Sequence, residues 1–400
     1  MIMIPDLIDG VFDEMVALRR DIHMHPELSG NEKRTSALVA KKLREYGVDE
    51  VQEGITEYGT GVVALIRGAA GPGKCIAIRA DMDALPLTED PGFEFASLNP
   101  GVMHACCHDG HTAALLGAAK VLADLRSEFA GSVKLLFQPA EESAPLGGAK
   151  PMVDAGVMEN PHVDAIIACH LTTSEQPGLI RLYKGEVTSS FDLFDIEVIG
   201  KSGHGSQPHT ACDAILAASQ YVVLLQQIVS RKIDPARTAI VSVGMINGGN
   251  ASNIIAEHVT MNMVSRFFGG EARDIIRRQV SDLAKGVELL SSCKFNVRHS
   301  PGYLSVNNDP ALIDLIKQAC TEAVGQNAAV YMTEPWPASE DFSYYIDATG
   351  TPGALVIIDA GHCGDEIYPL HHPKSSWREE SLKTAASFSV ISALAFLGKL

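Results

Sequence analysis

Residues 101–112 read Gly-Val-Met-His-Ala-Cys-Cys-His-Asp-Gly-His-Thr, so two cysteines and three histidines fall within a dozen positions. No other stretch of the chain is as dense in potential metal ligands. Cys106 and His108 stand two residues apart, and on an extended loop such side chains leave the same face of the backbone. They are therefore close enough to share or adjoin one metal ion.

A helix is predicted directly after His108, because the residues that follow it are almost all apolar. The candidate ligands would then lie in a loop between a strand and a helix, where α/β proteins usually build their sites. The alternative is that Cys106 and Cys107 are small buried hydrophobic residues, since free cysteine is among the most buried residue types.

The composition of the chain excludes several classes of protein and of binding partner. A chain of 400 residues with 46% hydrophobic and 20% charged residues can bury a large core in one or two domains. With 32 basic and 49 acidic residues, the net charge is −17, which disfavours nucleic acid and anionic membranes as partners. The eight cysteines form no CxxC pair, which is typical of a reduced, cytoplasmic protein. No secretory signal or membrane span is recognisable.

Potential ligands recur at the ends of predicted strands. These residues are Asp81 and Asp83 after strand 75–79, Glu141 and Glu142 after strand 132–137, and His170 after strand 163–169. Chance placement would not favour one edge of a sheet. The repetition therefore predicts a metal site at that edge.

The residues alone leave several roles open. Asp81 and Asp83 either accept a ring N–H from a ligating histidine or only cap a turn. Glu141 and Glu142 point opposite ways if the chain stays extended, so one could coordinate metal while the other takes a proton from water. Two surface glutamates would explain the pair as well.

From about residue 187 the order of predicted strands and helices changes. Residues 187–298 follow the order βαββαβ, which predicts a ferredoxin-like domain inserted into a discontinuous domain of residues 1–186 and 299–400. His371 and His372 precede a long terminal helix. One of them could complete the metal site, or both could belong to a surface loop.

Three motifs together carry a resemblance to a known family. Arg-Ala-Asp-Met-Asp-Ala-Leu-Pro, Met-His-Ala-Cys-Cys-His-Asp-Gly-His-Thr and Phe-Gln-Pro-Ala-Glu-Glu closely resemble the metal-dependent amidohydrolases that include hippurate hydrolases, aminoacylases and the plant auxin-conjugate hydrolases. The match runs from His23-Met-His-Pro-Glu-Leu-Ser to Leu370-His-His-Pro, nearly the whole chain. It implies a mixed-sheet α/β dimetal hydrolase domain with an inserted α+β ferredoxin-like lid that often mediates dimerisation.

The resemblance also implies a role for each matching residue. Five residues would be the metal ligands, namely Cys106, His108, Glu142, His170 and His371. Glu141 would be the general base. Asp81 or Asp83 would contact a metal ligand on its side away from the metal and support it there. His204 would stabilise the oxyanion, either in its own subunit or in the site of a neighbouring subunit. Asn253 and Arg266 would hold a substrate carboxylate, although Arg266 could instead form a salt bridge within the lid.

These roles define an expected reaction. Two divalent ions per subunit, Mn²⁺ or Zn²⁺ and alternatively Co²⁺ or Ni²⁺, would lower the pKa of a bridging water that Glu141 deprotonates. The expected substrate is an N-acyl amino acid. A dipeptidase or aminocarboxypeptidase with the same centre is the alternative, and a homologue that binds metal or ligand without turnover is a third hypothesis. A homodimer through the lid is also expected.

The sequence departs from the family pattern in three places. Position 107 is Cys where the family usually has Gly, and Leu-Thr-Thr follows His170 in place of Val-Trp-Pro. After His371 the motif reads His-Pro-Lys-Ser. None of these changes removes a ligand or the base, so they bear on substrate identity more than on catalysis.

Overall fold

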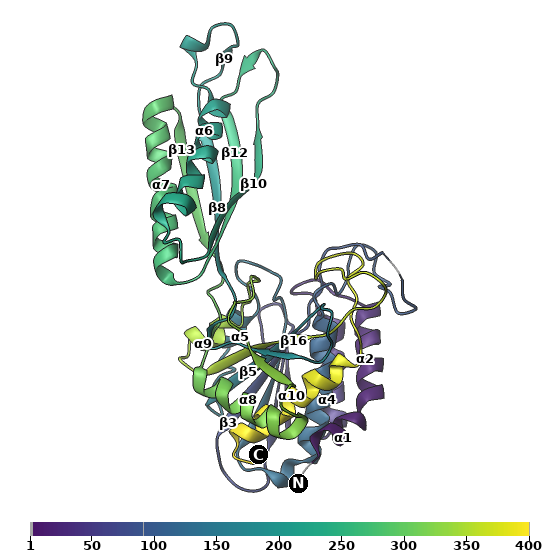
Figure 1. Ribbon diagram of the computed structural model, residues 1–400. Coiled ribbons are helices and arrows are strands. Elements are labelled where there is room, and N and C mark those ends of the chain that lie inside the picture. Colours follow the sequence, from purple (N-terminus) through teal and green to yellow (C-terminus); the bar gives the residue numbers. More distant parts are fainter. Residues whose placement is uncertain (1–2, 91, 400) are drawn as a thin grey trace. The chain divides into compact units, whose positions relative to one another are not determined.

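The computed structural model describes residues 3–90 and 92–399, which pack into two compact units (Figure 1). Unit 1 comprises residues 1–187, 306–335 and 341–400, and unit 2 comprises residues 188–305 and 336–340. The boundary lies later than the one predicted at residue 299, because β13 (Lys294–Pro301) pairs with β8 (Ser190–Ile199) as far as Pro301.

Unit 1 is built on an eight-stranded mixed sheet with the order β1-β2-β4-β3-β5-β16-β6-β15. Its strands are β1 (Glu50–Glu53), β2 (Val62–Arg67), β3 (Cys75–Asp81), β4 (Ser132–Gln138), β5 (Ala165–Thr172), β6 (Ile180–Leu182), β15 (Ala329–Tyr331) and β16 (Gly353–Asp359). β3 runs parallel to β4 and β5, and β5 runs parallel to β16. These central strands are buried on both faces, which explains their continuous apolar runs. A small sheet of β7 (Gly185–Glu186) and β14 (Asn307–Asn308) completes the strands of this unit.

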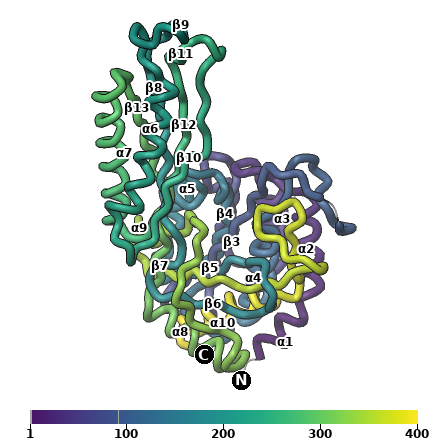
Figure 2. Tube along the Cα trace, turned by 45° about the horizontal axis from the view of Figure 1, so that its top comes forward, coloured from purple at the N-terminus to yellow at the C-terminus, as the bar shows by residue number. Residues whose placement is uncertain are grey.

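Helices cover the sheet of unit 1. They are α1 (Ile4–Asp9), α2 (Phe12–Met24), α3 (Lys33–Glu45), α4 (His108–Asp124), α5 (Ala149–Asp154), α8 (Pro310–Val324), α9 (Ser343–Asp347) and α10 (Ser381–Phe396), with a 3-10 turn at Arg126–Glu128. α4 is buried along most of its length because it is rich in Ala, Leu and Gly. Gly117 allows α2 to approach, since a Cβ there would lie 2.2 Å from Met15 Sδ. α1 and α10 lie side by side (Figure 2).

Unit 2 has two helices against one four-stranded antiparallel sheet of order β10-β12-β8-β13. Its further elements are β9 (Gly203–His204), a 3-10 turn (Pro208–Thr210), α6 (Ala214–Gln227), a π-helical turn (Ile228–Lys232), β10 (Ala239–Gly248), β11 (Ile254–Ile255), β12 (His258–Phe267) and α7 (Gly270–Ser291). Apolar residues alternate along β12 and meet those of both helices in a separate core. Chain order and strand order are those of a ferredoxin-like unit, so the predicted fold class is confirmed.

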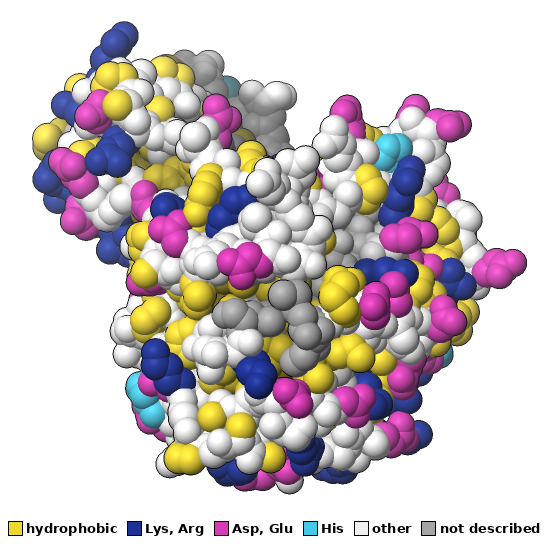
Figure 3. Space-filling view, turned by 60° about the horizontal axis from the view of Figure 1, so that its bottom comes forward, with side chains coloured by type: hydrophobic (Ala, Val, Ile, Leu, Met, Phe, Trp, Pro, Cys, Tyr) yellow, Lys and Arg dark blue, Asp and Glu magenta, His cyan; other side chains and the backbone are white. Residues whose placement is uncertain are grey.

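Charged side chains of both signs lie on one face of the molecule (Figure 3). On the face shown in Figure 3, Lys and Arg side chains are interspersed with Asp and Glu side chains. Among the described residues, no helix combines the length and the apolarity that crossing a membrane requires.

Gly131 offers a test of the turn between the 3-10 helix and β4. Its φ is +84°, and a Cβ would lie 2.2 Å from the backbone oxygen of Lys74, whereas Gly47 has φ +70° with nothing within 4 Å. Both positions carry the left-handed strain of an L-residue, roughly 1–2 kcal/mol. We expect Gly131→Ala to lower the thermal unfolding midpoint well beyond Gly47→Ala, because only the former adds a backbone clash. Equal shifts in calorimetry would contradict this packing.

Candidate metal centre

The carboxyl ends of β4, β3 and β5 lie next to one another because these three strands run parallel. Asp81 is the last residue of β3, and Glu141 and Glu142 follow the end of β4. His170 lies inside β5, although we predicted that it follows the strand, because β5 stays paired with β16 as far as Thr172. The parallel topology therefore delivers side chains from three strands to one edge of the sheet.

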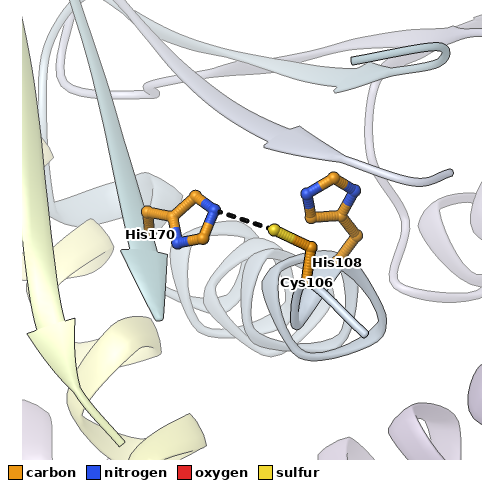
Figure 4. Close-up of side chains that lie close together, drawn as sticks. All are labelled: Cys106, His108 and His170. Atoms are coloured by element: carbon orange, nitrogen blue, oxygen red, sulfur yellow. Dashed lines mark hydrogen bonds between the residues drawn. The ribbon is translucent and has the colours of Figure 1, made fainter. Parts of the chain in front are cut away.

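Five potential ligands from four segments meet at this edge. Cys106, on the loop before α4, faces His170 on β5, with Sγ 3.6 Å from Nε2 and His108 beside them (Figure 4). On the other side, Nε2 of His371 lies 3.2 Å from the same Sγ and 3.1 Å from Oε1 of Glu142. Cys106 thus belongs to two groups of donor atoms, one with His108 and His170 and one with Glu142 and His371.

The donor atoms fit bound metal ions. A tetrahedral zinc ion with ordinary bond lengths would place sulfur and nitrogen ligands about 3.6 Å apart, close to the Cys106–His170 separation of 3.6 Å. His108 Nε2 is buried and forms no hydrogen bond within the described residues, and its nearest charged contact is Asp81 Oδ2 at 3.7 Å. A buried polar atom without a hydrogen bond costs about 1–3 kcal/mol. A thiolate, imidazoles and a carboxylate suit Zn²⁺, Mn²⁺ and related ions.

Two histidines of the cluster are oriented by hydrogen bonds from their Nδ1 atoms. Nδ1 of His108 lies 2.9 Å from the backbone oxygen of Asp83 and 3.2 Å from its Oδ1. Nδ1 of His170 lies 2.7 Å from the backbone oxygen of Leu171. Because these oxygens can only accept, each Nδ1 carries the proton, and each Nε2 keeps its lone pair for a metal.

His111 is close to the cluster but both of its ring nitrogens are engaged. Its Nε2 accepts a hydrogen bond from Leu171 N at 2.8 Å, so its Nδ1 donates to Asp81 Oδ1 at 2.6 Å. The other oxygen of Asp81 accepts from Arg79 at 2.6 Å. Of the two candidate carboxylates, Asp83 therefore supports His108 directly, and Asp81 anchors His111 and Arg79.

The pKa values of the candidate ligands are shifted in different directions. Burial lowers the pKa of His108, but the charge of Asp81 and the contact with Asp83 outweigh it and raise the pKa to about 10. Burial and a neighbouring histidine hold the pKa of His170 well below its usual range. Burial and the nearby glutamates raise the pKa of the Cys106 thiol well above its usual range. A metal ion would therefore displace protons on binding, as is general for thiolate and imidazole sites.

Strained backbone is concentrated beside the ligands. Cys107, Ala140 and His371 have φ values of 65°, 57° and 64° respectively, in the left-handed region that residues other than glycine rarely adopt. Each is a candidate ligand or lies within two residues of one. Such strain persists only where surrounding contacts impose it, as the bond from His371 N to Ala105 O at 2.8 Å does here.

The three candidate residues of unit 2 do not lie together. His204 and Asn253 lie at the two-stranded sheet of β9 and β11, where Gly205 N donates to Asn253 O at 2.9 Å. Arg266 lies near the far end of β12, where it donates to Ser339 Oγ at 2.7 Å. The eight residue steps along β12 from His258 to Arg266 span roughly 27 Å.

Sequence reasoning did not identify a buried ion-pair cluster behind the ligand loop. Asp109 Oδ2 lies 2.8 Å from Arg19 Nε and 2.8 Å from His23 Nδ1, and His23 also contacts Glu89 at 3.2 Å. Burial raises the pKa of Asp109, but the charges of Arg19 and His23 outweigh it and hold this pKa far below its usual range. The cluster ties α2 to the first turn of α4. Two signals in the sequence pointed to it, the acidic residue directly after His108 and His23 at the start of the matching motif.

Comparison with known proteins agrees with this fold and cluster. The sequence profile of Peptidase family M20/M25/M40 matches residues 77–393. The hippurate hydrolase of Campylobacter jejuni is 38% identical over 99% of this chain and 100% of its own length. The thermostable carboxypeptidase 1 of Saccharolobus solfataricus is 38% identical over 97% of this chain and 96% of its own.

A solved structure extends the likeness to three dimensions. The Bacillus subtilis YXEP protein, described as a dinuclear metal binding peptidase from the M20 family, matches with a TM-score of 0.82 and 32% identity. The match covers 98% of this chain and 100% of that one. The class that the sequence predicted, a metal-dependent amidohydrolase, is confirmed. The chain belongs to peptidase family M20/M25/M40.

Substitutions at position 107 test the backbone strain beside Cys106 and His108. Cys107 is buried in the core of unit 1 with φ 65°. We expect Cys107→Gly to change the free energy of unfolding little, because relief of the left-handed strain offsets the lost apolar contact. Cys107→Val should cost at least about 2 kcal/mol, since a β-branched residue is a genuine outlier there. Similar stabilities of the two variants in denaturant titrations would contradict the conformation.

Proposed function

We propose that this chain hydrolyses the amide bond of N-acyl amino acids with two divalent ions per subunit, Mn²⁺ or Zn²⁺. Their ligands are Cys106, His108, Glu142, His170 and His371. The observation that carries the proposal is the membership of Cys106 in two adjacent donor groups, which gives two ions a shared ligand. The hippurate hydrolase supports the substrate class, because hippurate is N-benzoylglycine, an N-acyl amino acid.

Glu141 is the general base of the proposed reaction. When bound, the ions lower the pKa of a coordinated water and polarise the scissile carbonyl. Glu141 is largely buried, and its neighbour Glu142 faces the donor group. Its carboxylate accepts a proton from the attacking water and passes one to the leaving amine. Asp81 assists indirectly, since it holds His111 and Arg79 in place.

Residues of unit 2 complete the proposed chemistry. His204 is exposed on β9 and offers an imidazole for the oxyanion. Asn253 and Arg266 would hold the substrate carboxylate, for which a guanidinium is a bidentate partner. Arg266 lies roughly 27 Å along β12 from the end of that strand nearest the β9–β11 sheet, and this distance exceeds the length of a small N-acyl amino acid. If both ends of unit 2 act on one substrate, they must come from two copies of the chain.

A homodimer through unit 2 would satisfy that requirement. β10 is an edge strand of the sheet, and Ile240, Met245 and Ile246 on it are exposed. On α6, Leu216 and Val223 are 57% and 71% exposed. An exposed apolar edge strand beside an apolar helix face is an aggregation risk unless another chain covers it. We propose that a second copy does so.

A peptidase activity is the second candidate function. The carboxypeptidase relative is as similar to this chain as the hippurate hydrolase, at 38% identity for each. The same centre would then cleave a peptide bond next to a free carboxylate, which Arg266 would bind in either case. Only the substrate pocket separates the two activities.

A substrate panel tests the proposed function. We would strip the protein with a chelator, return Mn²⁺ or Zn²⁺ separately, and measure amino-acid release from N-acetyl and N-benzoyl amino acids and from dipeptides. We expect metal-restored cleavage of the N-acyl substrates. Preferred cleavage of dipeptides would favour the peptidase, and no metal-dependent cleavage of any substrate would contradict the proposal.

Glu141→Gln tests the base within the same assay. We expect kcat to fall at least about 100-fold, the usual contribution of a general base, while the variant still binds metal. Metal content by elemental analysis is the control, because loss of metal would place Glu141 among the ligands instead. Unchanged turnover would refute its role.

Mixed dimers test whether His204 acts across subunits. We would unfold and refold His204→Ala and Glu141→Gln chains together. If His204 acts in trans, the mixed dimer contains one site with both an intact base and an intact His204, and activity should return. If His204 acts within its own chain, every site lacks one group and the mixture should stay inactive. Each variant refolded alone is the control.

A further inference from the structure

The turn that carries Glu141 and Glu142 is held by two buried carboxylates from other parts of the chain. Ala140 N donates to Glu32 Oε1 at 2.8 Å, and Glu142 N donates to Asp83 Oδ2 at 2.9 Å. Ala140 itself has φ 57°, an unfavourable conformation for a residue with a Cβ. The turn is therefore kept strained by contacts outside its own sequence.

Glu32 is unusual among the glutamates of this chain. It precedes α3 and is fully buried, and its Oε1 also accepts from Gly30 N at 2.8 Å. Its Oε2 is buried and has no hydrogen-bond partner within the described residues. Burial and the charge of Asp83 raise the pKa of Glu32 to about 7. Burying a carboxyl is costly unless hydrogen bonds compensate it. Both hydrogen bonds to Oε1 come from backbone N–H groups, and one of these belongs to the turn at Ala140.

We propose that Glu32 is a positioning residue for catalysis, whose carboxyl oxygen holds Ala140 in the left-handed conformation and so directs the side chains of Glu141 and Glu142. This inference rests on the proposed function, which gives those two side chains their roles. Without the acceptor at Glu32, Ala140 relaxes toward an ordinary conformation. The relaxation rotates the following peptide units and moves Glu142 relative to Cys106 and His371.

Glu27 provides a matched control in the same segment. Its carboxylate is partly buried and accepts from Arg34 N at 3.0 Å and from Thr35 N at 2.9 Å, so it anchors the start of α3 through two backbone N–H groups. Its side chain makes none of the described hydrogen bonds to the turn at Ala140. A loss that comes only from disturbing α3 should appear in both Glu27 and Glu32 variants, whereas mispositioning of Glu141 should appear only in the latter.

The experiment compares Glu32→Gln, Glu32→Asp and Glu27→Ala in the metal-loaded full-length protein. Gln keeps an oxygen at the position that accepts from Ala140, so most of kcat should remain. Asp keeps the charge but withdraws the acceptor by one methylene, so kcat should fall about 10- to 100-fold, the usual effect of a displacement near 1 Å. KM should change little, and the affinity for Zn²⁺ should weaken through Glu142. Glu27→Ala should lower the thermal midpoint while kcat remains.

Two results would overturn the inference. One is a wild-type kcat in Glu32→Asp, and the other is an equal loss of kcat in Glu27→Ala. If Glu32→Asp does not fold, the test relies on Glu32→Gln, which keeps the accepting oxygen. Loss of kcat in Glu32→Gln at an unchanged thermal midpoint would contradict the inference, because the proposed role needs only that oxygen. Glu141→Gln is measured alongside. An active Glu141→Gln refutes the proposed function itself, whereas an inactive one with a normal Glu32→Asp refutes only this inference.

Discussion

The guanidinium of Arg79 joins the parts of unit 1 on which the metal centre depends. It donates to Asp81 at 2.6 Å, to Gln138 at 2.8 Å and to Asp341 at 3.0 Å, and all four side chains are buried. These contacts tie the end of β3 to the end of β4 and to a segment that follows the inserted unit. Removing one partner of a buried pair costs about 3–5 kcal/mol, because a charge is left without compensation. The network therefore holds the edge of the sheet where the ligands meet.

Buried carboxylates extend this arrangement to the loops. Asp341 also accepts from Gly148 N and Ala149 N, both at 2.9 Å, and so anchors the far end of the loop that begins at Glu141. Asp83 supports both His108 and the backbone of Glu142. The loop that carries Glu141 and Glu142 is thus held by hydrogen bonds to buried acids from other segments. Such contacts explain how Ala140 can keep a strained, left-handed backbone.

In unit 2 the candidate residues do not form one cluster, because they lie near opposite ends of β12. The two-stranded sheet with His204 and the end of β12 with Arg266 are separated by most of the length of β12. Each end presents a group suited to a different part of a substrate, an imidazole at one end and a guanidinium at the other. In the homodimer that we propose, a second copy would cover the exposed apolar edge at β10 and α6, and the two ends that act on one substrate would come from different copies.

Much of the fold and the set of candidate ligands could be read from the sequence. Continuous apolar runs predict the buried parallel strands, and the βαββαβ order predicts the ferredoxin-like unit, because burial and periodicity are local properties. The motif around Cys106 named residues that the structure brings together. The end of β5 was misplaced, since its last residues extend only to match the pairing partner β16. Local pattern cannot report the length of a partner strand.

Tertiary structure alone decided which neighbour supports which ligand. The sequence left Asp81 and Asp83 equivalent, and only the fold shows that Asp83 meets His108 while Asp81 meets His111. It equally left Glu32 as an ordinary residue before a helix, although its carboxyl contacts a turn 108 residues away. Hydrogen bonds of this kind depend on distances between segments that are remote in the chain. Sequence thus determined which residues could take part in the chemistry, and packing determined how each of them is held, because orientation is a property of contacts and not of composition.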